Sequence, residues 1–83
     1  MINYAGLGHF LENQTANEVT VTFKDLENPR TIGLSLPALA RTQRLWWENQ
    51  TKPGARQCLA WLEVNWTVSA VDLSAQRVTF RKN

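Results

Sequence analysis

The sequence predicts a single α+β domain with a winged-helix-like order of elements: a helix, a strand, a short helix, two longer helices and a β-hairpin. Three observations support this prediction. Apolar residues recur at helical spacing near the start, apolar and polar residues alternate in three later segments, and prolines stand where two helices would begin. The 83 residues suffice for one compact domain, so residues 1–83 are expected to fold as one unit.

The first three elements occupy the N-terminal part of the chain. A helix is expected over residues 4–14, where apolar side chains recur every three or four positions, although two glycines lower its helix propensity. Residues 18–23 alternate apolar and polar side chains and contain β-branched residues, which is typical of a half-buried strand. Thr22 stands three residues before Asp25, as in a capped helix start, and predicts a short helix over residues 23–28.

The best-defined element is the helix predicted from Pro37 to Asn49. Ser35 can cap its start, and a proline fits the first turn because its missing N–H would have no partner there. Arg41 and Arg44 are expected on the outward side. The expected inward stripe consists of Leu36, Leu39, Ala40, Gln43, Trp46 and Trp47.

A second long helix is predicted over residues 53–64, with Thr51 as its cap and a proline in its first turn. Asn65 is expected to end it in the left-handed conformation. Residues 66–81 contain two alternating segments around a polar centre, which predicts an antiparallel hairpin. The isolated strand before the helices is expected to join this hairpin in a small sheet.

Basic and aromatic residues gather in the second half of the chain. Residues 1–40 hold two basic and four acidic side chains, whereas residues 41–83 hold seven basic and three acidic ones and all four tryptophans. Such a mixture can form a surface for a polyanion. No apolar stretch approaches the roughly 20 residues of a membrane span. The single cysteine excludes an internal disulfide and fits a reducing compartment, so we expect a cytoplasmic protein without a membrane partner.

Several short motifs resemble those of an uncharacterised family of small bacterial domains with an L-P-x-S-A, W-W-x-N, A-W and G-W signature. The matching segments are Thr22-Phe23, Leu36-Pro37-Ala38-Leu39-Ala40, Trp46-Trp47-Glu48-Asn49, Ala60-Trp61 and Asn65-Trp66. Leu39 replaces the usual serine of this family, Gln43 a frequent histidine and Asn65 a glycine. The resemblance covers most of the chain and implies one domain, and the family carries no established activity.

Few catalytic groups are present in the sequence. His9 is the only imidazole, Cys58 lies on the apolar side of its predicted helix, and the four glycines do not form a phosphate-binding loop. We therefore expect a non-enzymatic protein with no cofactor and no metal.

The first functional hypothesis is a nucleic-acid-binding domain, a dimer that regulates transcription or belongs to a mobile element. In a winged helix one helix enters the major groove of DNA and the hairpin tip approaches the backbone. Asparagine can read adenine and arginine can read guanine, while other cations hold phosphates. Either long helix can take the recognition role. The candidate contacts are Arg41, Gln43, Arg44, Asn49, Lys52, Arg56, Gln57, Gln76 and Arg77.

The second hypothesis is a protein-interaction module, either a homodimer or a domain that binds another protein. Adjacent helical residues point about 100° apart, so one ring of Trp46 and Trp47 is expected to reach the surface. The alternative is that both rings only pack the core. A third hypothesis is an aromatic pocket for a small cationic or planar ligand. Cations dispersed over the surface and paired with carboxylates would favour the second hypothesis over the first.

Overall fold

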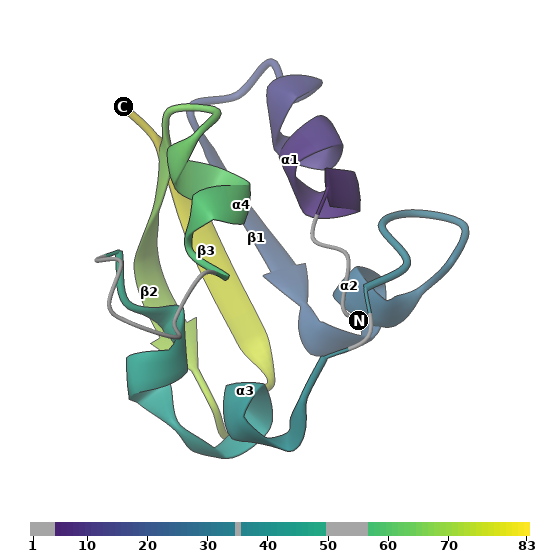
Figure 1. Ribbon diagram of the computed structural model, residues 1–83, viewed down its shortest axis with the longest axis vertical. Coiled ribbons are helices and arrows are strands. Elements are labelled where there is room, and N and C mark those ends of the chain that lie inside the picture. The colour runs from purple at the N-terminus through teal and green to yellow at the C-terminus, as the bar shows by residue number, and fades with distance from the viewer. Residues whose placement is uncertain (1–4, 35, 50–56) are drawn as a thin grey trace.

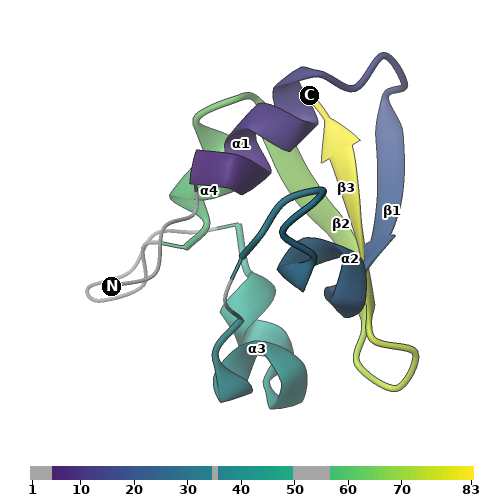
Figure 2. The same ribbon diagram turned by 90° about the vertical axis from the view of Figure 1, so that its right-hand side faces the viewer.

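Helices cover one face of a three-stranded antiparallel sheet and leave its other face bare in the part of the chain that the structure describes (Figures 1 and 2). The computed structural model describes residues 5–34, 36–49 and 57–83. This two-layer arrangement confirms the expected α+β class. The elements are, in chain order, α1 (Ala5–Glu12), β1 (Glu18–Thr22), α2 (Phe23–Glu27), α3 (Ala38–Thr42), the 3-10 helix η1 (Arg44–Trp47), α4 (Leu59–Leu62), β2 (Trp66–Asp72) and β3 (Arg77–Lys82).

The central strand is β3, because the strand order is β1-β3-β2. Both neighbours run antiparallel to it, which confirms the expected hairpin and the expected addition of the isolated strand. The register of β2 shifts between Val68 and Ala70, so that Ser69 forms a β-bulge. Among the described strands, β1 and β2 are therefore the two edges of the sheet.

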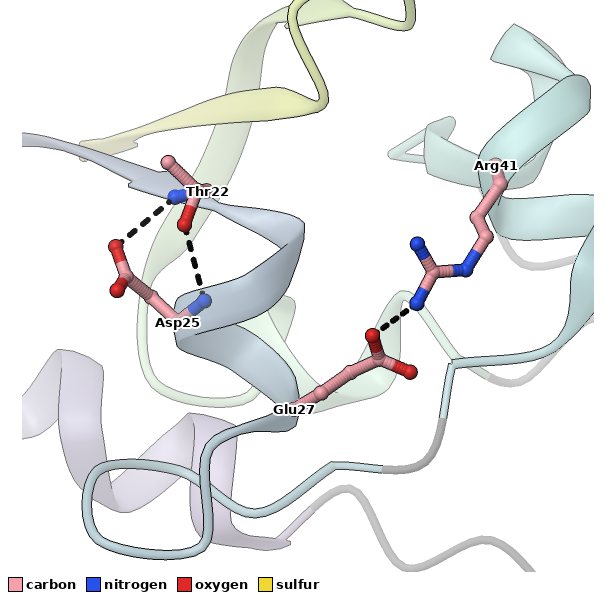
Figure 3. A network of polar contacts seen from close by, with 4 residues as sticks. All are labelled: Thr22, Asp25, Glu27 and Arg41. Carbon is pink, nitrogen blue, oxygen red and sulfur yellow. Dashed lines mark hydrogen bonds and ion pairs between the residues drawn. The ribbon is translucent and has the colours of Figure 1, made fainter.

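The capping box expected at the start of α2 is confirmed (Figure 3). The Thr22 hydroxyl accepts a hydrogen bond from the Asp25 backbone N–H at 3.0 Å, and the Asp25 carboxylate accepts one from the Thr22 N–H at 3.2 Å. The Phe23 N–H donates to the carbonyl of Gln76 at 2.8 Å, which ties α2 to the turn between β2 and β3.

The prediction of one continuous helix from Pro37 to Asn49 is wrong. The chain leaves helical geometry at Gln43, where φ is −119° and ψ is 112°, and this residue separates α3 from η1. In an unbroken helix the rings of Trp46 and Trp47 would point about 100° apart. The break instead lets one of them enter the core while the segment before it stays on the surface.

Because of this break, two residues that were expected to face the core are exposed instead. Leu39 is 58% exposed and Gln43 is exposed, although both were expected inside. The chain turns Leu45 outward as well, with 67% of its surface exposed. The members of the stripe that do face the core fully are Leu36, Ala40 and Trp47.

The second expected helix is represented by α4, which has four residues. Its expected cap Thr51, the proline that follows and the cap Ser35 of the preceding helix lie outside the described residues. Asn65, after α4, has φ of 67°, which confirms the expected left-handed helix end.

A stack of aromatic rings fills the space between the helices and the sheet. Trp47 lies between Phe23 and Trp61, with ring centroids 5.5 Å and 6.0 Å away and interplanar angles of 14° and 22°. Phe80 of the central strand closes the stack against Trp61 at 5.7 Å. All four rings are at most 2% exposed, so this stack provides much of the buried apolar area of a small domain.

Two glycines allow α1 to approach its neighbours closely. A Cβ on Gly6 would lie 2.6 Å from the carbonyl oxygen of Ile32, and one on Gly8 would lie 3.2 Å from that of Ala60. The first contact is with the loop after α2 and the second is with α4, so the two glycines fit the helix between two pieces of backbone.

We expect Gly6→Ala to lower the free energy of unfolding by about 1–3 kcal/mol, because the added methyl group meets backbone that must move. In an open helix the same change raises stability by roughly 1 kcal/mol. Chemical denaturation followed by tryptophan fluorescence measures the sign. Glu12→Ala, at an exposed position of the same helix, is the control. A stabilised Gly6→Ala variant would contradict the close approach.

Candidate interaction surface

The side chain of Asn49 joins three elements that are distant in the sequence. Its Oδ1 atom accepts hydrogen bonds from the backbone N–H of Val68 at 2.8 Å and from the indole Nε1–H of Trp61 at 2.9 Å. Its Nδ2 atom donates to the carbonyl of Val68 at 2.9 Å. The segment after η1 is therefore fixed to both β2 and α4.

These bonds place Asn49 at the outer edge of the sheet. The N–H and C=O groups of one strand residue point to the same side, and both groups of Val68 bind Asn49 rather than β3. In the described part of the chain β2 has β3 as its only strand neighbour. The asparagine amide therefore takes the place that the backbone of another strand would occupy.

The expectation that one ring of the tryptophan pair reaches the surface is confirmed for Trp46, which is only half-buried. Trp47 is 2% exposed and donates its Nε1–H to the carbonyl of Ala40 at 2.8 Å, so its assignment to an interaction surface is corrected. The two rings meet edge to face with centroids 4.6 Å apart. Trp46 is thus seated on the core rather than projecting from it.

Among the described residues, the basic side chains expected to contact nucleic acid differ in their surroundings. Arg41 makes an ion pair with Glu27 (Figure 3). Arg77 is exposed, and its register partner across the hairpin is Asp72.

Arg44 is exposed on η1, and the structure shows no ion pair for it among the residues described. Two more of the expected contacts, Lys52 and Arg56, lie outside the described residues.

The expected amide contacts also take different positions. Asn49 is used internally, which corrects its assignment as a base-reading residue, since its oxygen already accepts two hydrogen bonds. Gln57 donates from Nε2 to the carbonyl of Trp46 at 2.9 Å. Gln43 is exposed at the break before η1, and Gln76 is exposed in the hairpin turn with φ of 55°. Among the described residues, Gln43 and Arg44 are thus two expected contacts that are exposed side by side in the sequence.

An apolar hollow lies between η1 and the edge strand β2. Its volume is about 250 Å³, and Leu45 at its rim is 67% exposed. Its lining, called the η1 hollow below, consists of Arg44, Leu45, Trp47, Glu48, Val68, Ser69, Ala70 and Val71. Leu39, the other strongly exposed leucine of the described residues, does not line it.

Sequence reasoning missed Leu45, although a signal was present. The residues three and four positions away on either side are Arg41, Thr42, Glu48 and Asn49, all of which are polar. A leucine with only polar neighbours at helical spacing does not belong to an apolar stripe. No comparable signal indicated Val68, because its pairing with Asn49 spans 19 positions of the sequence.

The bare face of the sheet carries a second shallow hollow of about 290 Å³. At its centre Thr20 and Thr79 share a hydrogen bond of 2.8 Å between their hydroxyl oxygens. Arg81 and Arg77 of the central strand have Glu18 and Asp72 as register partners. This face is therefore mostly polar and mixed in charge, and it shares only Ala70 and Val71 with the lining of the η1 hollow.

No metal-binding cluster is present among the residues that the structure describes. No three His, Cys, Asp or Glu side chains come close enough there to hold a metal ion. Cys58 is 1% exposed, and His9 is exposed on α1. The longest helix within residues 5–34, 36–49 and 57–83 has eight residues, which is far short of a membrane span.

The fold and this surface define a small α+β domain with an edge strand that is capped by an asparagine and an apolar hollow beside that strand. The chain belongs to the family described as Domain of unknown function (DUF7662), which matches residues 4–83. This agrees with the resemblance to an uncharacterised family. No match was found among curated proteins or among solved structures.

We expect Asn49→Ala to lower the free energy of unfolding by about 3 kcal/mol, roughly 1 kcal/mol for each of the three polar groups that lose a partner. Urea denaturation measures this loss. Asn13→Ala is the matched control, because that exposed amide donates one hydrogen bond to the carbonyl of His9. Equal effects of the two substitutions would show that the Asn49 amide has no special role.

Proposed function

We propose that this domain is a non-enzymatic protein-interaction module that binds through the η1 hollow. The observation that carries the proposal is Leu45, a leucine 67% exposed at the rim of an apolar hollow. A single exposed leucine is ordinary on a protein surface, whereas one that continues an apolar concavity indicates a contact site. Val68, Ala70 and Val71 provide the apolar wall on the side of β2.

The charge distribution favours protein over nucleic acid as the partner. Figures 1 and 2 place α3 and the β2–β3 turn at the same end of the molecule, as a winged helix would place its recognition helix and wing. At this end, however, Arg41 is paired with Glu27 and Arg77 stands opposite Asp72. Carboxylates beside these cations repel a phosphate backbone and weaken the attraction on which non-specific binding depends.

The lengths of the helices argue in the same direction. The order of elements and the strand order β1-β3-β2 support a winged-helix-like arrangement. A recognition helix must present several side chains along a groove, and α3 and α4 have five and four residues. Nucleic-acid binding remains a prediction, for which titration with duplex DNA at low and moderate salt is the test.

The proposal can be tested by site-specific photo-crosslinking in the cells that produce the protein. A photoreactive amino acid at position 45 is expected to give one crosslinked product of discrete mass, because this position lies at the proposed contact. The same amino acid at position 12, which is exposed on α1 and does not line the hollow, is the control and should give none. Equal products from both positions, or no product from position 45, would refute the proposal.

A further inference from the structure

The kind of partner that fits the η1 hollow follows from its backbone and its charges. Its wall on one side is β2, an edge of the sheet. An edge strand ordinarily offers its free N–H and C=O groups to a strand of another chain. At such an edge a partner strand can extend the sheet.

Asn49 opposes sheet extension at this edge. Its amide already binds the outward N–H and C=O groups of Val68, and the bulge at Ser69 interrupts the register one residue later. A partner strand would have to displace the amide and leave the indole N–H of Trp61 without its acceptor. The hollow therefore accommodates side chains rather than a backbone.

The charges at the rim are of opposite sign and lie on the same short segment. Arg44 at the start of η1 is exposed and has no ion pair among the described residues, and Glu48 follows the end of η1. A polyanion or an acidic peptide would be attracted by the first residue and repelled by the second. A two-fold axis through the hollow instead brings each residue near its counterpart of opposite charge in the other copy.

Glu48 can take part in such a contact in addition to the interactions it has within its own chain. A carboxylate has two oxygens with about four acceptor positions in total, so a guanidinium from a second copy can bind beside an existing partner. The rim is thus complementary in charge to itself, which is the property that an isologous interface requires.

We propose that the occupant of the η1 hollow is a second copy of this chain, related by a two-fold axis. This inference rests on the proposed function and names its partner. Leu45 of each copy lies against Val68, Ala70 and Val71 of the other, and Arg44 of each copy lies near Glu48 of the other. The two sheets stay separate, because the amide of Asn49 continues to cap each edge.

Sedimentation equilibrium of the purified full chain, from micromolar to millimolar concentration, tests this dimer. Leu45→Ser is expected to raise the dissociation constant about tenfold, because it removes the leucine that packs against the apolar wall of the other copy. Leu39→Ser is the matched control, because it removes another exposed leucine that does not line the hollow, and it should leave the dissociation constant unchanged. Circular dichroism verifies that each variant is folded.

A charge exchange provides the second, independent arm. Arg44→Glu alone should weaken the dimer by placing carboxylates opposite one another, and Glu48→Arg alone should weaken it by placing cations opposite one another. The double variant R44E/E48R should recover most of the lost affinity, because the opposite charges meet again across the axis. Recovery distinguishes a direct contact from a loss of folding.

The outcomes separate this inference from the proposed function. A protein that sediments as a monomer at all concentrations overturns the dimer, as does a dimer that Leu39→Ser and Leu45→Ser weaken equally. In the crosslinking experiment, a product of twice the mass of the chain agrees with the dimer. A discrete product of another mass from position 45 retains the interaction module with a different protein partner and overturns the dimer. Salt-sensitive binding of duplex DNA that Arg44→Glu abolishes would replace both with nucleic-acid recognition.

Discussion

The amide of Asn49 is the interaction on which the arrangement of this domain depends. It connects the segment after η1 to the edge strand β2 through both backbone groups of Val68, and to α4 through the indole of Trp61. Burying an indole N–H or a strand N–H without a partner is costly, and one side chain satisfies both. The aromatic stack and the edge of the sheet are thus held in one geometry by three hydrogen bonds.

The same arrangement links the core to the surface. The chain leaves helical geometry at Gln43, which lets the ring of Trp47 enter the stack between Phe23 and Trp61. Because Trp47 points inward and Asn49 holds the following segment against β2, Leu45 faces outward beside that strand. The hollow that we propose as a contact site is therefore a consequence of how the tryptophans are packed.

Patterns in the sequence predicted the parts of the fold that depend on interactions between residues close together in the chain. Alternation predicted the three strands of the described residues, the spacing of Thr22 and Asp25 predicted the capping box, and Asn65 was expected in the left-handed conformation that it adopts. The break at Gln43 and the pairings of Arg41 with Glu27 and of Asn49 with Val68 were not predictable in this way. The two pairings are tertiary contacts across 14 and 19 positions, which no periodicity in the sequence indicates.

Membership of DUF7662 supports one domain over nearly the whole chain and leaves function to be inferred from surfaces. The central claim is that the Asn49 amide occupies the outer edge of β2. Amide hydrogen exchange of the native protein, followed residue by residue by NMR, tests it most directly. The account predicts that the N–H of Val68 and the indole N–H of Trp61 exchange as slowly as amides of the central strand, despite the edge position of β2. Exchange of both at the rate of exposed loop amides would contradict it.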